Sequence, residues 1–375
     1  MRSVFLLLLT LGCLAAVGQT PRQAPSGDVD ALMRAGIAAQ RQGDNRTAIE
    51  NYRKVLAIRP EIVEARIGLG AALAAAGQLD EAIDEDQRAL AAAHDKNAVR
   101  MNLGMAYYKK GDAEQAREQF EAVHAAMPHD VAVAVQLGYA YVKLGKLSDV
   151  VDLLTPLEAG NESNMDLEYV LAFSLIESGK EKEGVPRMEK VAQATHSASA
   201  YVIAGADLLH RNETSKARID LDEAMKLDPS IPGLATMAGQ VRYAMGDLVE
   251  ASDAFQAALR QNPRDFNANL DLGAIRLEEH DVANARPLLE LALELQPGFP
   301  MARLEMAKLD EIEGKYAEAA ATLEDLIKAK PDWMEAHWAL AAAYLETNRS
   351  EDGKRERMIA QQLMGRSGQN APEPH

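Results

Sequence analysis

Glycine and proline recur at intervals of 34 residues along this chain of 375 residues. The glycines form two registers, one at Gly36, Gly70, Gly104 and Gly138, the other at Gly43, Gly77, Gly111, Gly145 and Gly179. The prolines form a third register, at Pro229, Pro263, Pro297 and Pro331. Three registers with a single period predict one structural unit that is repeated along the chain. A unit this short cannot bury its own apolar face, so successive units must stack.

The stretch LGMAYYKKGDAEQAREQF, residues 103–120, shows how the sequence builds one unit. Aromatic residues make up only 5% of a chain rich in Ala and Leu, which favours helices. Gly104 lacks a side chain where two helices are expected to cross closely. Gly111 suits the left-handed conformation after a first helix, and Asp112 can then cap the second helix. The recurrence of these glycines favours a structural role over a phosphate-binding loop.

This pattern resembles the tetratricopeptide repeat, whose family pattern is W-x-x-L-G-x-x-Y, then A-x-x-x-F, then P. In one unit the resemblance is carried by Leu103, Gly104, Tyr107, Ala116, Phe120 and Pro128. Other units contribute Gly36, Ala48, Tyr52 and Pro60, and then Gly239, Ala251, Phe255 and Pro263. The resemblance implies an all-α fold, a right-handed superhelical solenoid of about ten helix–turn–helix repeats. It also implies a scaffold for protein–protein interaction.

The resemblance and the composition together predict the organisation of the chain. We expect a signal peptide at 1–18, a disordered linker at 19–28, the repeat array at 29–365 and a disordered tail at 366–375. The repeats are expected to start near residues 29, 63, 97, 131, 165, 198, 232, 266, 300 and 334.

Three prolines and the C-terminal part interrupt the regular pattern. Pro156 falls inside an expected second helix and predicts a bent or loose joint, because proline breaks the hydrogen-bond ladder. Pro186 and Pro287 lie early in second helices, where they predict a kink or a late start. After Asn348 the repeat pattern fades into a polar segment, which we expect to form a helix that caps the last unit.

The N-terminal segment has the build of a secretory signal peptide. Arg2 precedes the apolar run VFLLLLTLGCLAAV, and the small residues before Gln19 fit a cleavage site. The run is too short for a comfortable membrane span. Because TLGC, ending at Cys13, resembles a bacterial lipobox, we keep three outcomes open: ordinary cleavage, a lipid anchor at Cys13, and an uncleaved anchor. The prediction is an exported protein of the bacterial periplasm or cell envelope, alternatively an outer-membrane lipoprotein.

Composition and motifs argue against several classes of function. The formal net charge of −17 disfavours nucleic-acid binding, which needs clustered Lys and Arg. Cys13 is the only cysteine, so ordinary cleavage would leave no disulfide. No zinc-protease motif, phosphate-binding loop or nucleophile-elbow motif occurs. We therefore expect no enzyme, no metal and no cofactor.

The resemblance also implies which residues bind a partner, because first helices of this family line a concave groove. Carried over to this sequence, the peptide-binding positions are Arg34, Arg41, Met101, Asn102, Met105, Tyr108, Lys109, Gln136, Tyr139, Lys143, Tyr169, Phe173, His210 and Tyr243. Further groove positions are Val135, Glu177, Val202, Asp271, Glu278, Glu305, Lys308, Glu311, Trp338 and Glu346. The groove is thus expected to change from basic to acidic along the chain. The alternative is that the apolar members pack between first helices and the charged ones are solvated.

Aromatic and methionine side chains flanked by charges suit a peptide or helix ligand. The family's clamp for acidic chaperone tails is not expected, because Met33, Ile37, Ile67 and Met101 stand at its positions. The favoured function is a non-catalytic adaptor that binds a peptide or helix of an envelope partner. The alternatives are an envelope assembly lipoprotein, for example of pilus, secretion or polysaccharide-export machinery, and a substrate-recruiting subunit of a separately encoded enzyme.

Overall fold

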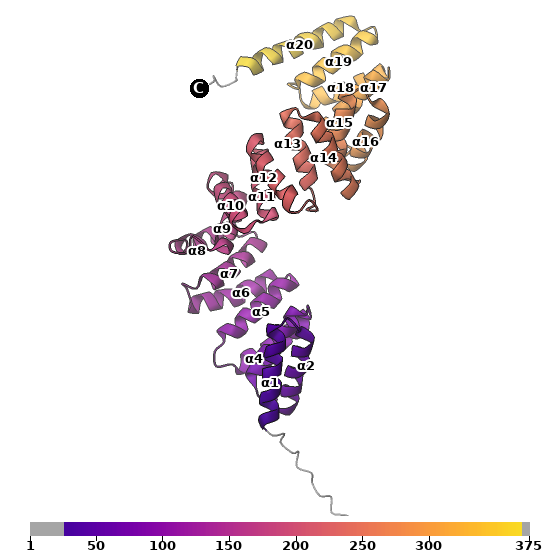
Figure 1. Cartoon of the computed structure of the whole chain (residues 1–375). Helices are drawn as coiled ribbons and strands as arrows, with labels where there is room; N and C mark the ends of the chain where they lie inside the picture. Colours follow the sequence, from indigo (N-terminus) through magenta and orange to yellow (C-terminus); the bar gives the residue numbers. More distant parts are fainter. Residues whose placement is uncertain (1–25, 370–375) are drawn as a thin grey trace, which may run out of the picture. The chain divides into compact units, whose positions relative to one another are not determined.

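A computed structural model describes residues 26–369, and within them it contains twenty α-helices, one short 3-10 helix and no strand (Figure 1). The predicted all-α class is therefore confirmed. The chain divides into two compact units, which meet in the sequence between Gly160 and Asn161. We call them the N-terminal unit and the C-terminal unit and describe each by itself.

The N-terminal unit contains α1 (Ser26–Arg41), α2 (Asn45–Ile58), α3 (Val63–Ala75), α4 (Leu79–Ala92), α5 (Asn97–Lys110), α6 (Ala113–Ala126), α7 (Val131–Lys143), α8 (Leu147–Leu154) and the 3-10 helix Thr155–Leu157. The C-terminal unit contains α9 (Met165–Glu177), α10 (Glu181–Thr195), α11 (Ala198–His210), α12 (Thr214–Leu227), α13 (Leu234–Met245), α14 (Leu248–Gln261), α15 (Phe266–Glu278), α16 (Val282–Leu295), α17 (Pro300–Ile312), α18 (Tyr316–Ala329), α19 (Met334–Glu346) and α20 (Ser350–Gln369).

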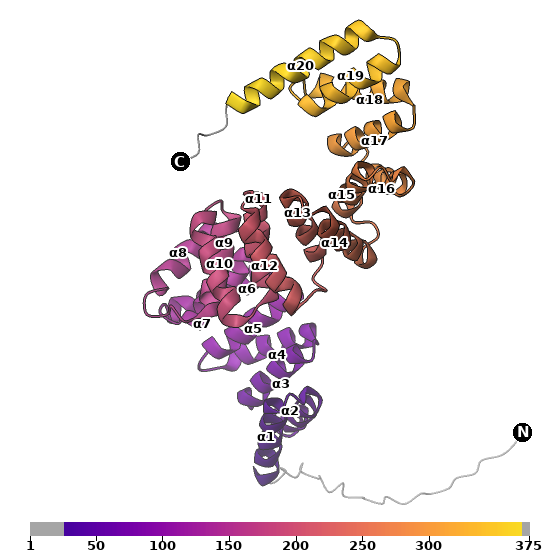
Figure 2. The same ribbon diagram turned by 45° about the horizontal axis from the view of Figure 1, so that its top comes forward.

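Each odd-numbered helix packs against the even-numbered helix that follows it, and each pair packs against the next pair of its unit (Figure 2). We call the odd-numbered helices first helices and the even-numbered ones second helices. Short turns join the two helices of a pair, so the helices of a pair are antiparallel. Neighbouring first helices, such as α1 and α3 or α15 and α17, approach each other more closely than neighbouring second helices do. The first helices therefore lie on the inner side of each stack.

The helical part extends slightly beyond the predicted array of residues 29–365. Residues 26–28, predicted as linker, begin α1, where Asp28 in the first turn favourably faces the positive end of the helix dipole. Residues 366–369, predicted as tail, end α20, which meets no proline before Pro372. The predicted signal peptide, including Cys13, and the remainder of both segments lie outside the described residues.

Gly104 lies where the two helices of a repeat meet. A Cβ atom placed on Gly104 would lie only 2.4 Å from Cε1 of Phe120 on α6. Phe120 itself is fully buried. The interpretation that a larger residue at position 104 would push the helices apart is thereby confirmed, and the group it would meet is an aromatic ring.

The turn between α5 and α6 has the predicted caps. Gly111 ends α5 with a φ of 95°, a left-handed conformation that glycine adopts without the strain that a side chain would add. The Asp112 carboxylate then accepts a hydrogen bond from the backbone N–H of Gln115 at 3.3 Å. This bond satisfies one of the free donors in the first turn of α6.

Replacing Asp112 with alanine is expected to lower the free energy of unfolding by about 1 kcal/mol, because α6 loses its N-cap. Chemical denaturation followed by circular dichroism measures the change. Gln78→Ala is the matched control, because Gln78 precedes α4 without a side-chain cap hydrogen bond. Equal losses in the two variants would show that the Asp112 cap contributes nothing.

Two kinds of polar contact recur with the repeat. Within a repeat, a side chain near the start of the first helix bonds to one that follows nineteen residues later: Arg66 to Glu85 at 2.6 Å, Glu168 to Arg187 at 3.1 Å, and His337 to Glu356 at 2.6 Å. Between repeats the separation is twenty residues: Gln87 to Tyr107 at 2.9 Å, Glu121 to Tyr141 at 3.0 Å, and Glu324 to Tyr344 at 2.7 Å. Tyr107 therefore contacts the neighbouring repeat.

The three irregular prolines behave differently from one another. Pro156 does not lie inside a second helix, because α8 ends at Leu154 and a 3-10 turn contains the proline, which cannot supply an N–H to the helix. Of the two alternatives at Pro186 and Pro287, the late start is wrong, since α10 and α16 begin five residues before them, and the kink stays a prediction. Both prolines are exposed and near the helix start, so water can reach the backbone carbonyl that lacks an N–H partner.

The last helix of the described range, α20, packs against α19 and differs from the preceding second helix at a core position. Arg357 stands in α20 at the repeat position that the fully buried Leu323 occupies in α18. Its guanidinium lies 5.7 Å from the centre of the Trp338 ring on α19. The role of α20 as a cap of the last unit stays a prediction.

Candidate inner-face binding site

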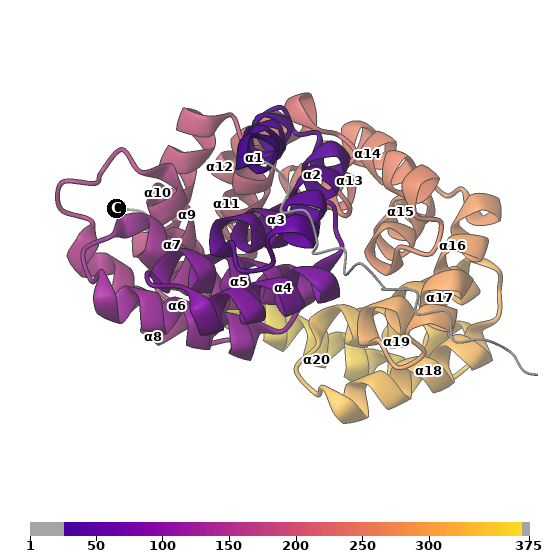
Figure 3. The same cartoon turned by 90° about the horizontal axis from the view of Figure 1, so that it is seen from below.

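The candidate site is the inner face, which we define by five positions in each first helix. In α5 these positions are Met101, Asn102, Met105, Tyr108 and Lys109, and the same register applies to every other first helix. Figure 3 shows the labelled helices from below, and contacts between neighbouring first helices hold them side by side within each unit. Residues in this register therefore form rows across neighbouring repeats. The predicted site residues are the members of these rows.

An aromatic cluster connects α5 and α7 on the inner face of the N-terminal unit. The rings of Tyr108 and Tyr139 are 6.4 Å apart and tilted by 57°. The Lys143 ammonium lies 4.5 Å from the centre of the Tyr108 ring and donates a hydrogen bond to the backbone carbonyl of Tyr108 at 3.3 Å. Met101 and Met105 are half-buried against the hydrophobic cluster around Phe120. The structure therefore brings these predicted residues together as one apolar surface with a cation at its edge.

The polar members of the N-terminal unit are distributed around this cluster. Arg34, Arg41 and Lys109 are exposed, and the half-buried Asn102 and Gln136 occupy the same row as Arg34. Val135, an apolar inner position, is buried in the core. This agrees with the alternative that apolar inner residues pack between first helices.

The aromatic residues predicted at the start of the C-terminal unit are half-buried against its core. Tyr169 and Phe173 on α9, and Val202 on α11, pack against a hydrophobic cluster that includes Ala172, Met188 and Ala204. Burial raises the pKa of the Tyr169 hydroxyl. His210 is exposed at the end of α11 and does not join this cluster. Tyr108 is partly buried in the same way against the cluster around Phe120, so burial does not separate it from Tyr169, Phe173 and Val202.

The inner face of α13 to α19 carries carboxylates, as the predicted change of charge requires. Tyr243 donates a hydrogen bond to Glu278 at 3.1 Å, and Gln240 donates one to Asp271 at 3.3 Å. Burial raises the pKa of Asp271 to about 6. Lys308 donates to the buried Glu305 at 2.8 Å within α17. Side-chain bonds between α13 and α15 thus hold this acidic surface in place.

Glu311, Trp338 and Glu346 complete the predicted C-terminal positions. Glu311 is half-buried, and burial raises its pKa to about 7. Trp338 is half-buried beneath Arg357, and Glu346 is exposed at the end of α19.

The sequence interpretation missed a buried carboxylate beneath the inner face. Asp86 on α4 is 0% exposed, and neither of its oxygens has a hydrogen-bond partner in the described part of the chain. A Cβ on Gly70 would lie 2.2 Å from Oδ1, so the carboxyl is held against α3. Burial raises the pKa of Asp86 to about 7. The nearby Asn102 amide opposes this rise, although it forms no hydrogen bond with the carboxylate, and the charge of Glu85 adds to the rise. A comparison of the repeats would have revealed Asp86, because the equivalent positions of the preceding and following repeats hold Tyr52 and Phe120.

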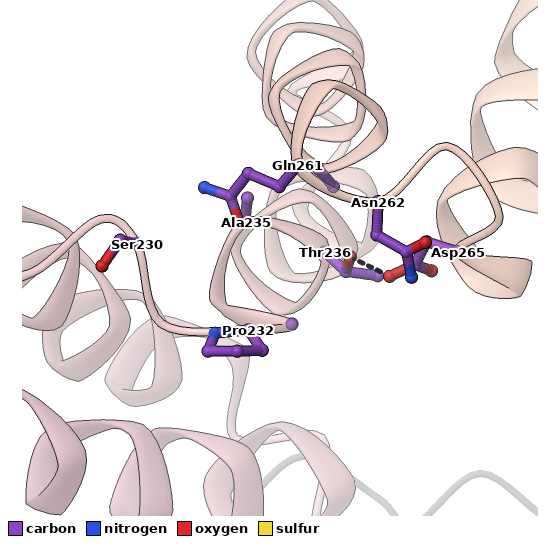
Figure 4. A pocket seen from close by; sticks show the side chains of 9 residues that line it. Ser230, Pro232, Ala235, Thr236, Gln261, Asn262 and Asp265 are labelled. Atoms are coloured by element: carbon purple, nitrogen blue, oxygen red, sulfur yellow. Dashed lines mark hydrogen bonds between the residues drawn. The ribbon is translucent and has the colours of Figure 1, made fainter.

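One cavity lies at the turns that precede α13 and α15 (Figure 4). It has a volume of about 440 Å³, and its polar lining includes Thr236, Gln261, Asn262 and Asp265. Thr236 donates a hydrogen bond to Asp265 at 2.9 Å, and Asp265 also caps α15. These two groups serve the local structure, because their bond connects α13 to the N-terminal cap of α15.

Residues 26–369 contain no cluster of three or more His, Cys, Asp or Glu side chains that could hold a metal ion. None of the helices described in this range is long and apolar enough to cross a membrane.

Comparison with known proteins places the repeats in one family. Two models of the tetratricopeptide repeat match this chain, one over residues 33–98 and 236–300, the other over 107–167 and 276–344. Superkiller complex protein 3 of Homo sapiens is 35% identical over 108 residues, which are 29% of this chain and 6% of that protein. The TPR repeat-containing protein YpiA of Bacillus subtilis (strain 168) is 25% identical over 186 residues, which are 49% of this chain and 44% of that protein.

Among solved structures, the C-terminal part of a TPR repeat-containing protein from Cytophaga hutchinsonii has a TM-score of 0.50 and 16% identity. The match covers 63% of this chain and 97% of that one, and it is a likeness of fold alone. The chain spans less than half the length of each of these curated relatives.

Proposed function

The chain belongs to the tetratricopeptide repeat family, and on that premise we propose that it is a non-catalytic scaffold of the bacterial cell envelope that holds a peptide or helix of a partner protein on its inner face. Repeats of this family support protein–protein interaction. The envelope location and the choice of surface are the parts that the experiments below test.

The observation that carries the proposal is the surface formed by Met101, Met105, Tyr108 and Tyr139. These side chains are half-buried, so each keeps exposed area on the inner face. Tyrosine and methionine offer large contact areas, and methionine adapts its shape to a partner. Aromatic anchors of this kind contribute most of the binding energy in protein interfaces.

Replacing Tyr139 with alanine is expected to weaken partner binding at least about tenfold, because an aromatic anchor is lost. The partner is first captured in cells with a photo-cross-linking residue at position 139, identified by mass spectrometry, and then titrated against the purified variants. Tyr316→Ala is the control, because Tyr316 begins a second helix, α18. If the partner cross-links equally well from position 316, or binds the two variants equally, the inner face is not the binding surface.

The envelope location rests on the sequence of residues 1–18. Mass spectrometry of the mature N-terminus distinguishes the two exported forms: a free or cyclised Gln19 indicates a soluble periplasmic protein, and a diacylated Cys13 indicates a lipoprotein. An intact Met1 in a soluble protein would contradict export. The lipoprotein outcome would favour the second candidate function, an assembly factor of pilus, secretion or polysaccharide-export machinery.

A third candidate is a subunit that brings substrates to a separately encoded enzyme. Protein O-mannosyl-transferase TMTC1 of Homo sapiens is 26% identical over 162 residues, but these are only 18% of that protein. This likeness does not assign transferase activity to the chain. Co-purification of an enzyme whose activity on its substrate falls with Tyr139→Ala would favour this candidate.

A further inference from the structure

We propose that the inner face of the N-terminal unit binds an acidic amphipathic segment of a partner protein. This inference rests on the proposed function, since it names the chemistry of the segment held by the same surface. It follows from three properties of this face: the sign of its charges, the lack of ion pairs that would neutralise them, and the apolar surface beside them.

The charged inner positions of the N-terminal unit are all basic. Arg41, Lys109 and Lys143 occupy one register, in the last turns of α1, α5 and α7, and Arg34 occupies another inner register, earlier in α1. No Asp or Glu stands at an inner position of α1, α3, α5 or α7. An acidic chain, with a formal net charge of −17, therefore presents a basic surface here.

These four cations have no ion-pair partner among the described residues, unlike many other cations of the N-terminal unit. Arg53 pairs with Glu81 at 2.6 Å, and Arg117 pairs with Glu121 at 2.7 Å. Within residues 26–369, no carboxylate oxygen lies within 4.0 Å of a charged nitrogen of Arg34, Arg41, Lys109 or Lys143. A carboxylate of a partner can therefore pair with them without first displacing an internal one, which lowers the cost of binding.

The helix dipole accounts for only part of this arrangement. Cations in the last turn of a helix are stabilised by about 0.3 to 1 kcal/mol, which explains Lys109 and Lys143 without a ligand. The same effect disfavours Glu278 and Glu346, which occupy this register in α15 and α19. Because the register carries both signs, the dipole does not determine its charge. The N-terminal and C-terminal units therefore present opposite charges to a partner.

Apolar side chains lie beside these cations, and for this reason we expect the bound segment to be amphipathic. Met105, Tyr108 and Tyr139 lie between the row of Arg34 and the row of Lys109 and Lys143, and Met101 lies beside the row of Arg34. A segment that combines apolar residues with carboxylates satisfies both kinds of group. Nucleic acid fits less well, because its phosphates would meet only four inner cations within an acidic chain.

The test is a selection from a phage-displayed library of random 12-residue peptides on the purified mature chain. Enriched peptides are expected to combine Asp or Glu with Leu, Phe or Tyr. The double variant Lys109→Glu with Lys143→Glu should bind a synthetic copy of an enriched peptide at least about tenfold more weakly. The control is Lys54→Glu with Lys96→Glu, which makes the same change of charge outside the inner face and should change affinity less than about twofold.

Four outcomes would overturn the inference. Enriched peptides that are basic or uncharged would show that the face selects another chemistry, while leaving the proposed function in place. Equal weakening by the two double variants would show an effect of net charge alone. Equal binding of a 12-nucleotide oligouridine to the same surface would show that the cations recognise anions without selecting peptide. If no enriched peptide loses affinity in Tyr139→Ala, the proposed function fails together with the inference.

Discussion

Replacing Asp86 with asparagine is expected to stabilise the protein by about 4 kcal/mol at pH 8, because it removes a buried charge that has no partner. Asp86 is 0% exposed and has no hydrogen-bond partner among the described residues, and burial raises its pKa from 3.8 to about 7. Asparagine has nearly the shape of the protonated acid, so the substitution changes the charge and little else.

The pH dependence of this gain follows from the direction of the pKa shift. The folded state holds the proton of Asp86 up to about pH 7, whereas the unfolded chain releases it near pH 3.8. Below pH 3.8 both states are protonated and the charge has no effect on stability. The penalty grows as the pH rises from about 4 to about 7 and then levels off. The gain from Asp86→Asn is therefore expected to shrink by about 2 kcal/mol between pH 8 and pH 5.5.

Urea unfolding of both proteins at pH 5.5 and pH 8 measures this difference, and hydrogen exchange of the α3–α5 amides locates it. Asp84→Asn is the control, because Asp84 is an exposed carboxylate of the same helix, and it should change stability by less than about 0.5 kcal/mol. Asp86→Leu gives an independent check, because Leu289 occupies this position opposite Gly273 in a later repeat. A gain from Asp86→Asn that is equal at the two pH values would contradict the explanation.

Replacing Gly104 with alanine is expected to destabilise the protein by about 1 to 2 kcal/mol. The added methyl group would lie within 2.8 Å of three atoms of the Phe120 ring, and the ring is fully buried and cannot move aside. Alanine gains up to about 1 kcal/mol in helix propensity, which offsets part of the overpacking.

The repeats themselves indicate which change restores stability. Tyr52, Phe120 and Phe255 all face glycine across the helix pair. In contrast, Ala307 shares its cluster with Leu323 at the corresponding position. Gly104→Ala combined with Phe120→Leu is therefore expected to lose about 1 kcal/mol less than the sum of the two single losses. Gly298→Ala is the control, because a Cβ there meets no atom within 4 Å. Additive losses in the double variant would show that the two positions do not press on each other.

Much of the fold could be predicted from the sequence because its determinants are local and repeated. Gly111 and Asp112 act within one turn of chain, and the same turn chemistry recurs at fixed intervals. The end of α8 was harder to place, because the length of a helix that contains an early or late proline depends on the solvation of the freed carbonyl. Thus Pro186 is accommodated inside α10, whereas Pro156 lies in the 3-10 turn after α8.

The candidate site could be predicted only as a set of positions. The register placed Tyr108, Tyr139 and Tyr169 on the inner face, at three different positions of their first helices. The structure brings the rings of Tyr108 and Tyr139 together, and it packs both Tyr108 and Tyr169 partly against core clusters. Which inner side chains meet depends on the side chains of the neighbouring repeat, which the register does not specify. The predicted roles of these residues in binding stay predictions until a partner is captured.

By itself, the sequence determined the repeating unit, its turns and its close helix contacts, because backbone freedom at glycine and proline is a property of single residues. Only the tertiary structure decided which carboxylates are buried, which cations have ion-pair partners and which inner side chains are core. Those properties depend on contacts between residues that are about twenty or more positions apart, such as Gln87 with Tyr107 or Lys143 with Tyr108. Asp86 occupies a regular position in the repeat pattern, and its charge is unusual only because its neighbours exclude water from that position.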